Sequence, residues 1–439
     1  MPQLSTQEVE RLSRAAHLLR EAERPVRVIR HLLWPEQAWR NFEAGGMVTP
    51  PSVEYPDFDL PPVLGDLAAA RKYISGDTPV DGWLQRCATA IETSARMLDA
   101  TGTPEFFKFS CELYGAPDTP LLDGRSTPLE LARRLDEILE GYNRSPVSYG
   151  VVPIELSAEE VAQQMELRVK TFFGDAAPPV EVVEHLSGKA LAGAKYIRIR
   201  RGAHFSDQDL RQLTHHEAYV HIGTTLNGLA QERFPILASA HAGTTRTQEG
   251  LAVFEELISG SLDPARFQRL GARATAIDMC INGADFMEIY RFYIERGEMP
   301  EEAFDGARRV LRGGPLSGGS PFTKDCTYLQ GLLQIHNFLR SAVSAGRIDC
   351  LGLLFCGKMD LEDMPALGLL ADELLLTPPR YLPPRFADPR FLIAYLAYSA
   401  FLNSINLPAI AEYYREFLSR IPVTEVMAGV CYLSAHRPE

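Results

Sequence analysis

The spacing of two histidines constrains this chain more than any other feature of its sequence. In the stretch His215–His221 (HHEAYVH), the second and third histidines are separated as i and i+5, whereas the common zinc-binding signature places them at i and i+4 on one helical face. On an ideal α-helix, His216 and His221 would point about 140° apart. A π-type turn, whose hydrogen bond closes from i to i+5, would realign them. We therefore predict a π-turn within residues 216–221.

A carboxylate follows in the stretch QEGLA, residues 248–252. Two imidazoles and one carboxylate can hold a zinc ion and leave its fourth position to a water that becomes acidic near neutral pH. On this basis His216, His221 and Glu249 are candidate ligands. Glu217 is then free to take the proton of that water. The simpler alternative is that Glu217 and His221, at i and i+4, only pair on a solvated helix face.

The composition of the chain is that of an ordinary globular protein. Of its 439 residues, 46% are hydrophobic and 23% are charged, which is typical of folded domains. The 44 basic and 57 acidic residues give a net charge of −13, a balance that repels phosphate backbones and anionic lipid surfaces. We therefore expect neither a nucleic-acid partner nor a membrane partner.

Cysteine usage and the first residues predict a cytoplasmic protein. The seven cysteines are odd in number and are never spaced as CxxC, which argues against a disulfide framework and against a thiolate zinc site. The N-terminus shows no apolar segment of the kind a signal peptide needs. The longest uncharged run, residues 391–411, is interrupted by polar residues and a proline. Residues 391–402 are therefore predicted to form a buried core helix, too short to span a bilayer.

Most of the chain is predicted to be helical. Apolar residues recur at helical spacing, and capping boxes begin at Ser157 and Ser206. Residues 47–62 contain five prolines and are predicted to be irregular. The predicted helices are residues 6–24, 83–100, 126–141, 157–173, 206–227, 248–259, 267–296, 301–311 and 326–345.

Residues 147–155, 180–184 and 195–200 are predicted to be strands. The last of these leads directly into the histidine-bearing helix. We therefore expect an α+β, mostly helical fold, a zincin-like metallopeptidase with a small β-sheet packed on an HExxxH active-site helix. The last strand would form a wall for a substrate chain. Residues 1–115 are assigned to a helical N-terminal region with the Pro-rich linker, and residues 116–439 to a zincin-like catalytic domain.

Four blocks of the sequence resemble a known family. They read HHEAYVHIGTTLNG, TQEGLAVFEELISG, RRVLRGG followed by GGSPFTKDCTYLQGLL, and FCGKMDLEDMPALGLL. In this order they are similar to the QEGLA-motif proteins, labelled flavohaemoglobin expression-modulating in bacteria and related to the animal microtubule-associated tyrosine carboxypeptidases. The resemblance runs from about residue 105 to about residue 435.

The resemblance implies a zinc metallopeptidase whose ligands are His216, His221 and Glu249. It assigns Glu217 as the general base. All four residues are present here. The animal members of the family remove a C-terminal tyrosine from tubulin. We carry over the reaction class alone, so the expected substrate is the C-terminus of a peptide or protein, with the preferred side chain left open.

A carboxypeptidase also needs a cation for the terminal carboxylate of its substrate and a donor for the developing oxyanion. Arg312 and Lys324 are favoured as cations, although ordinary surface arginines and a local pair between Lys324 and Asp325 would fit the sequence equally well. Tyr328 or Tyr290 could donate a phenolic hydrogen bond, but a tyrosine in an apolar helix is more often part of the core.

Residues next to the candidate ligands are expected to hold the imidazoles in place. Glu255 and Glu256 are candidates for fixing the imidazole tautomers, and a solvated acidic face is the alternative. Gly250 would allow the two metal-bearing helices to pack closely.

Two other functions compete with hydrolysis. A non-haem Fe(II) oxygenase uses the same ligand set but leaves Glu217 unexplained. A regulatory protein could bind zinc without turnover, and it would be insensitive to Glu217→Gln.

Overall fold

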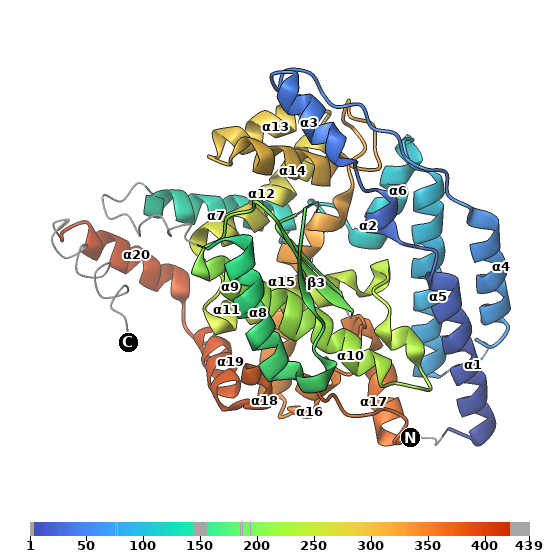
Figure 1. Cartoon of the computed structure of the whole chain (residues 1–439). Helices are drawn as coiled ribbons and strands as arrows, with labels where there is room; N and C mark the ends of the chain where they lie inside the picture. Colours follow the sequence, from blue (N-terminus) through green and yellow to red (C-terminus); the bar gives the residue numbers. More distant parts are fainter. Residues whose placement is uncertain are drawn as a thin grey trace.

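The computed structural model describes residues 4–421 except for 75, 77, 144–155, 185, 187 and 194. The strand expected at residues 147–155 lies outside this described part. Within it, the chain is mostly helical and contains one small three-stranded sheet (Figure 1). The expected mostly helical α+β class is therefore confirmed.

Eight helices precede the sheet in the described residues. Capping boxes at Ser5 and Ser157 begin two of them. Each serine hydroxyl accepts a hydrogen bond from the backbone N–H of the glutamate three residues later, and the carboxylate of that glutamate accepts one from the serine backbone N–H. These bonds satisfy amides that the first turn of a helix leaves unpaired. The eight helices are α1 (Thr6–Glu23), α2 (Val28–His31), α3 (Glu36–Ala44), α4 (Leu60–Arg71), α5 (Pro79–Asp99), α6 (Pro104–Tyr114), α7 (Pro128–Asn143) and α8 (Ala158–Phe173).

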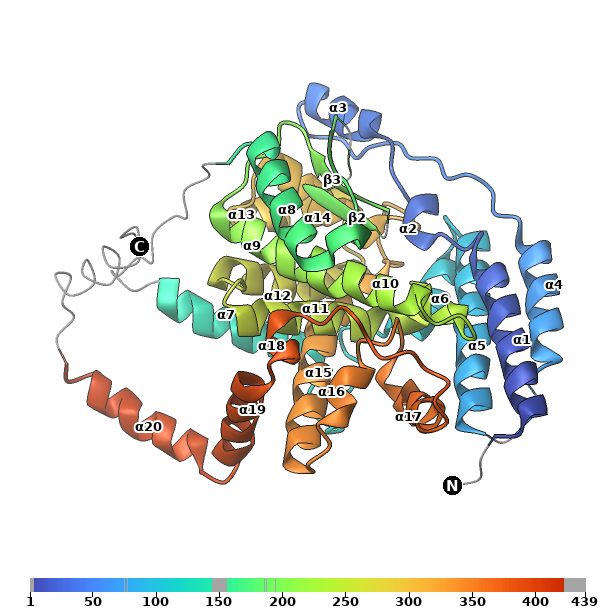
Figure 2. The ribbon, with the colours of Figure 1, turned by 60° about the horizontal axis from the view of Figure 1, so that its bottom comes forward.

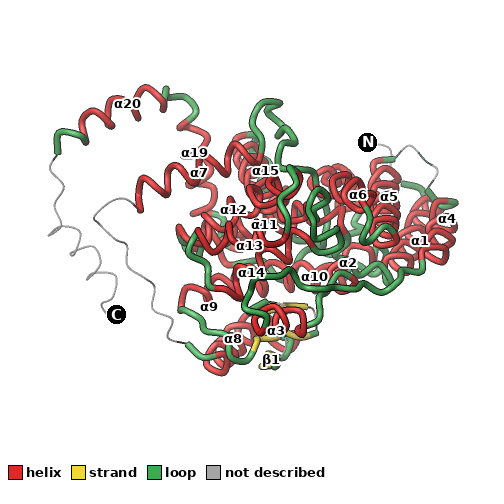
Figure 3. Tube along the Cα trace, turned by 90° about the horizontal axis from the view of Figure 1, so that it is seen from above, coloured by secondary structure: helices red, strands yellow, loops and turns green. Residues whose placement is uncertain are grey.

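The sheet has the strand order β1-β3-β2, with β1 (Val180–Val183), β2 (Ala190–Gly193) and β3 (Tyr196–Arg200). β1 runs parallel to β3 and β2 runs antiparallel to it. Ile197 and Ile199 of β3 are buried and alternate with half-buried residues, as the period of two predicts. Figure 3 shows the strands at one margin of the helical body.

The expectation that the last strand forms the free wall of the sheet is wrong. β3 is central, so its backbone groups pair with strands on both sides. The two edges are β1 and β2. Sequence periodicity did not reveal β2 because Ala190–Gly193 is short and contains two alanines and a glycine. β2 also contacts the segment that bears the histidines.

After the sheet the chain is again helical. A continuous helical run comprises α9 (Asp207–Leu213), η2 (Thr214–Ile222) and α10 (Gly223–Leu229). The later α-helices are α11 (Thr245–Ser259), α12 (Pro264–Ile281), α13 (Phe286–Glu295), α14 (Pro300–Leu311), α15 (Cys326–Ser344), α16 (Asp349–Leu353), α17 (Met364–Asp372), α18 (Pro384–Ala387), α19 (Arg390–Leu402) and α20 (Leu407–Leu418). Short 3-10 turns lie at η1 (Gly174–Ala176), η3 (Pro235–Ala238), η4 (Ala242–Thr244), η5 (Thr323–Asp325) and η6 (Leu361–Asp363).

Helix boundaries differ from expectation at several places, of which three involve a glycine or a proline. The helix expected at residues 267–296 is two helices, because Gly283 adopts a φ of +99° and Asp285 caps α13. Pro61 and Pro62 belong to the first turn of α4, where the missing N–H would have no helical partner in any case. α7 continues past Gly141 to Asn143 instead of ending at the glycine.

The helix expected in the core at residues 391–402 is only partly buried. In α19 only Leu392 and Leu396 are buried, and the helix packs along one side against α15. Within the described residues no single helix is long and apolar enough to cross a membrane. The bent pair α19 and α20 meets the length and composition criteria only when both helices are taken together, with 87° between them.

One large hydrophobic core includes residues from α1, α4 and α5 together with residues from α11, α15 and α17. The three N-terminal helices lie side by side at one end of the molecule (Figures 1 and 2). Residues on both sides of the expected boundary at 115/116 thus share a core, and the division into two domains stays a prediction.

α11 and α15 cross at two glycines. A Cβ atom placed on Gly250 would lie 2.2 Å from the carbonyl carbon of Gly331, and one on Gly331 would lie 2.3 Å from the carbonyl oxygen of Arg246. No side chain fits between the helices at this crossing. Gly250 therefore allows a close approach, but to α15 instead of the histidine-bearing helix that was expected.

We expect Gly250→Ala to lower the free energy of unfolding by about 1–3 kcal/mol, because the new methyl group overlaps the backbone of α15. The matched control is Gly368→Ala in α17, where a Cβ meets nothing within 4 Å. There the better helix propensity of alanine should leave stability unchanged or raise it by up to about 1 kcal/mol. Urea denaturation of both variants measures the difference, and equal midpoints would contradict the close-packing argument.

Candidate metal centre

The histidines lie on a π-helix. The segment η2, Thr214–Ile222, has π-type hydrogen bonding between α9 and α10. The predicted π-turn is therefore confirmed, and it extends beyond the single turn expected. The ring centroids of His216 and His221 are 4.8 Å apart, so both imidazoles face one point.

Threonine hydroxyls flank the π-helix. Thr214 Oγ1 donates to the carbonyl of Leu210 at 2.7 Å, and Thr225 Oγ1 donates to the carbonyl of His221 at 2.7 Å. Thr224 Oγ1 lies 2.7 Å from the carbonyl of Val220 and 2.8 Å from Gln248 Oε1. Such hydroxyls bind carbonyls where a change from α to π pairing disturbs the backbone ladder.

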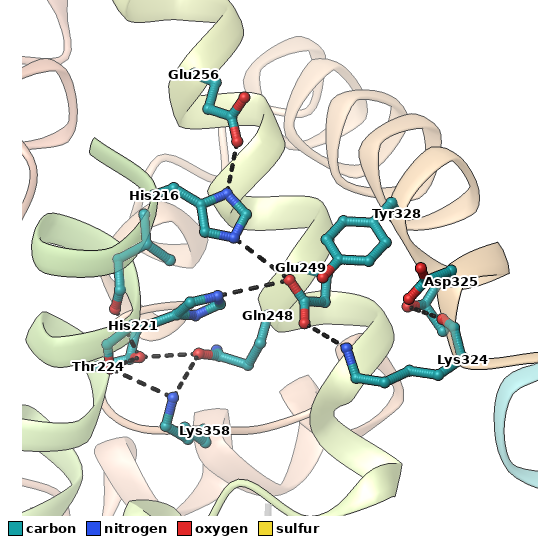
Figure 4. Close-up of polar contacts among 12 residues, drawn as sticks. His216, His221, Thr224, Gln248, Glu249, Glu256, Lys324, Asp325, Tyr328 and Lys358 are labelled. Carbon is teal, nitrogen blue, oxygen red and sulfur yellow. Dashed lines mark hydrogen bonds and ion pairs between the residues drawn. The ribbon is translucent and has the colours of Figure 1, made fainter. Parts of the chain in front are cut away.

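Three donor atoms converge in front of this segment (Figure 4). Glu249 Oε2 is 3.5 Å from His216 Nε2 and 3.6 Å from His221 Nε2. Among the described residues, the donor atoms of these three side chains all lie within 4.8 Å of one another. Ligand atoms about 2.0–2.1 Å from a tetrahedral ion are separated by roughly 3.3 Å, so the spacing fits one zinc ion.

The third candidate ligand has one unsatisfied oxygen. Glu249 Oε2 is buried and has no hydrogen-bond partner, although it is the oxygen that faces both imidazoles. A buried polar atom without a partner is rare and needs an explanation. A divalent cation between the three side chains would satisfy it, and His₂Glu is a donor set that zinc accepts.

Glu256 fixes the orientation of His216. Its Oε1 lies 2.6 Å from His216 Nδ1, 2.9 Å from Gln212 Nε2 and 3.1 Å from Arg266 Nη2. A proton held on Nδ1 leaves Nε2 free to bind a metal. Glu255 instead contacts His215, at 2.9 Å between Oε1 and Nδ1. Both glutamates are fully buried, so the alternative of a solvated acidic face is wrong.

The charges around the donors keep the carboxylates ionised. Burial alone would raise the pKa of Glu249, but Lys324 and the two imidazoles hold that pKa well below its usual range. Burial would lower the pKa of His216, but Glu249 and Glu256 outweigh it and raise that pKa to about 10. Burial lowers the pKa of His221. Against burial, Arg266 and His216 lower the pKa of Glu256 to about 2. Metals bind such carboxylates in the ionised state.

Glu217 follows His216 on the π-helix and is half-buried. Its charge acts on two neighbours, since it raises the pKa of both His216 and Lys358. It is not a member of the donor group formed by His216, His221 and Glu249. Glu217 is thus a carboxylate next to the donor group that is not one of the three candidate metal ligands.

Lys324 and Tyr328 also enter the site, from η5 and α15 (Figure 4). Lys324 Nζ lies 2.7 Å from Glu249 Oε1, so one oxygen of that carboxylate contacts a lysine and the other faces the imidazoles. The ring of Tyr328 stacks on His216 with 6.5 Å between centroids. The contact between Lys324 and Glu249 helps to orient that carboxylate. That Lys324 binds the terminal carboxylate of a substrate stays a prediction.

Arg312 is a buried cation without a counter-ion in the described residues. Its guanidinium is 5.1 Å from the centroid of the Phe322 ring, its Nε has no hydrogen-bond partner, and the residue is only 9% exposed. Burial, followed by the charge of Arg309, lowers its pKa to about 10. By contrast, Arg309 Nε is 2.6 Å from Asp325 Oδ2, so the alternative pair between Lys324 and Asp325 is replaced by this one.

Tyr114 is a buried phenol whose pKa responds to Arg312 and to charges of the donor group. Burial raises the pKa of its phenol to about 12, while Lys324 and Arg312 lower that pKa and Glu249 raises it. The phenol therefore lies within electrostatic range of all three charges. Tyr290 is elsewhere: its hydroxyl is 3.3 Å from Met47 Sδ and its ring packs on Phe42 in a separate core cluster. Of the two expected phenols, only Tyr328 is at the site.

Lys358 was missed in the sequence. It is 7% exposed, and its Nζ lies 3.3 Å from the carbonyl oxygen of His221 and 3.4 Å from Gln248 Oε1. Burial lowers its pKa to about 8, against the charges of Glu249 and Glu217. The available signal was a single lysine within the apolar stretch FCGKM of the fourth family-like block.

Comparisons with known proteins agree with the motifs. The family model of the microtubule-associated tyrosine carboxypeptidases matches residues 40–404. No curated protein sequence matches the chain. Among solved structures, one described as a lipoprotein from Colwellia psychrerythraea has a TM-score of 0.40 and 15% identity, over 71% of this chain and 63% of that chain. The chain thus spans less than two thirds of that protein, and a TM-score this low does not establish a common fold. Because the family model matches most of its length, the chain belongs to the microtubule-associated tyrosine carboxypeptidase family.

Proposed function

We propose that this protein is a zinc-dependent, zincin-like metallopeptidase that removes the C-terminal residue of a peptide or protein. The observation that carries the proposal is the convergence of His216, His221 and Glu249 on one point, with Glu217 adjacent and outside the donor group. Membership of a family described as tyrosine carboxypeptidases supports the peptidase class. The terminal residue that this chain prefers is left open.

In this proposal each side chain has a separate part. A bound zinc would supply an acidified water and a Lewis acid for the scissile carbonyl. Glu217 takes the proton of the attacking water and delivers it to the leaving amine. Glu256 keeps the proton of His216 on Nδ1, and Lys324 holds the second oxygen of Glu249. Tyr328 is the proposed donor to the carbonyl oxygen.

The substrate would lie between the sheet and the cation. β2 is an edge strand in contact with η2, and an extended peptide can add to such an edge through its backbone. Arg312 is the proposed partner of the terminal carboxylate, because a buried guanidinium without a counter-ion gains a charged bidentate bond when an anion enters.

Glu217 separates the competing functions. A regulatory protein with a structural zinc would not need an acid beside its ligands, and a non-haem iron oxygenase would have no use for a base at this position. Both would therefore tolerate loss of this carboxylate.

We expect the purified protein to contain zinc and to release C-terminal residues from a peptide library. Glu217→Gln should retain the metal and lose about 10²–10⁴-fold in kcat, the usual contribution of a general base. His216→Ala should lose the metal as well. Metal analysis and mass spectrometry of the released residues measure both effects.

The matched control for these variants is Glu166→Gln, which changes an exposed glutamate of α8. Equal release by wild type and Glu217→Gln, with zinc present in both, would contradict hydrolysis and favour the regulatory alternative. Iron in place of zinc, without peptide release, would favour the oxygenase.

Arg312 should determine the preference for a free terminal carboxylate. We expect wild type to favour a peptide acid over the same peptide with an amidated C-terminus by about 10–100-fold in kcat/KM, the usual strength of a hydrogen bond to a charged group. Arg312→Gln should remove most of this preference, whereas Arg390→Gln, at an arginine whose side chain is 88% exposed, should keep it. If Arg312→Gln kept the preference, the carboxylate would be bound elsewhere.

Lys358 should strengthen metal binding indirectly, because it contacts the carbonyl of His221 at the end of the π-helix. We expect Lys358→Met to weaken zinc affinity by about 10–100-fold, as for other groups that orient ligands. Competition with a chromogenic chelator measures the affinity, with Lys170→Met on the surface of α8 as control. Unchanged affinity in Lys358→Met would show that this contact does not orient His221.

A further inference from the structure

The last described helix lies apart from the body that the other described residues form. In all three ribbon and tube views α20 projects away from the helical body (Figures 1, 2 and 3). None of its residues is buried. A helix with no tertiary partner is only marginally stable in water, especially at 12 residues. Its stability therefore calls for a partner surface.

α20 is strongly amphipathic. At 100° per residue, Ile410, Tyr413, Tyr414, Phe417 and Leu418 lie on one side, and Ile421 just after the helix continues the same stripe. The opposite side bears the charged residues, which pair within the helix as Glu412 with Arg415 and Glu416 with Arg420. The apolar stripe thus has no charged side chain in it, and the polar face has no net charge.

The apolar surface continues onto α19. Phe391, Tyr398 and Phe401 follow one side of that helix, Ile405 lies just after its end, and all four are 41–61% exposed. At the elbow between the helices a hollow of about 530 Å³ is lined by Ile405, Asn406, Ala409, Ile410, Tyr413 and Tyr414. We call this continuous surface, from Phe391 to Ile421, the elbow face.

The elbow face is large enough for a stable interface. Its large apolar side chains are each 38–64% exposed: Phe391, Tyr398, Phe401, Ile405, Leu407, Ile410, Tyr413, Tyr414, Phe417, Leu418 and Ile421. At roughly 150–200 Å² for a fully exposed side chain they present on the order of 900 Å². A standard interface buries about 800 Å² on each partner, and monomers rarely expose apolar patches of this size.

The sequence of α20 matches itself under a two-fold rotation. In an antiparallel pair centred between Arg415 and Glu416, position 410 meets 421, position 413 meets 418 and position 414 meets 417. The apolar stripe is therefore mapped onto itself. The charged residues lie on the opposite side, where they pair within their own helix, so the rotation brings no unpaired charge into the contact. Self-complementarity of this kind is what an isologous dimer requires.

We propose that the elbow face binds a second copy of this chain, with α20 packed antiparallel on α20 of that copy. An anionic membrane surface is a poorer partner, because attraction to acidic lipids needs excess lysine or arginine. In α20 and the residues just after it, glutamates balance the arginines, and the whole chain has a net charge of −13.

The test uses the full chain in sedimentation velocity over a range of concentrations. Wild type is expected to sediment as a dimer, and Phe417→Glu to raise the dissociation constant at least about 30-fold, as for loss of a central anchor residue. Ser419→Glu, on the opposite side of the helical stripe, should leave the dimer intact. Circular dichroism of each variant establishes that the body remains folded.

The register is tested with a short bis-maleimide and two variants that each add one cysteine, Ile410→Cys and Ile421→Cys. The antiparallel dimer brings residue 410 of one copy to residue 421 of the other, while equivalent residues stay about 16 Å apart along the axis. Cross-linking above the wild-type background should therefore appear only when the two variants are mixed. A monomeric wild type, cross-linking of each variant alone, or binding of wild type to neutral or anionic vesicles without dimerisation would overturn the proposal.

Discussion

The crossing of α11 and α15 determines where the donor atoms lie. Because neither Gly250 nor Gly331 has a side chain, the two backbones touch. Glu249 is the residue before this contact, and Lys324 lies just before α15 begins, so the crossing brings their charged ends within 2.7 Å. The position of Glu249 opposite the imidazoles therefore depends on the absence of two side chains, together with the hydrogen bonds that join α11 to the histidine segment and to α10.

Burial of several carboxylates is the second condition of this architecture. An ionised carboxylate away from water is costly unless a cation or several donors accompany it. Glu256 has Arg266 and His216, Asp325 has Arg309 and Arg273, and Glu249 has Lys324. Each pair joins two different elements of the fold. Removal of Lys324 would leave Glu249 without its lysine partner, so the centre and the packing around it depend on one another.

Local rules predicted much of the structure, and long-range geometry limited the rest. The spacing of His216 and His221 contains its own solution, since only one helical form aligns residues five apart. Capping boxes and period-two alternation are equally local. The edge position of β2, the crossing at Gly250 and the contact of Lys358 with His221 depend on tertiary neighbours. For α19 the prediction of a buried core helix was wrong, because an apolar sequence does not itself reveal whether another part of the protein covers the helix.

The π-helix also sets the direction of everything that follows it. One extra residue rotates α10 by about 100° relative to a continuous α-helix. In the observed rotation the Asn227 amide binds the carbonyls of Phe355 and Tyr381 and the amides of Arg380 and Tyr381. Deleting a residue between the histidines would restore the familiar four-residue spacing and turn Asn227 away from these loops. The irregular motif is thus locked in by its own scaffold, and a search for the regular spacing would pass over chains of this kind.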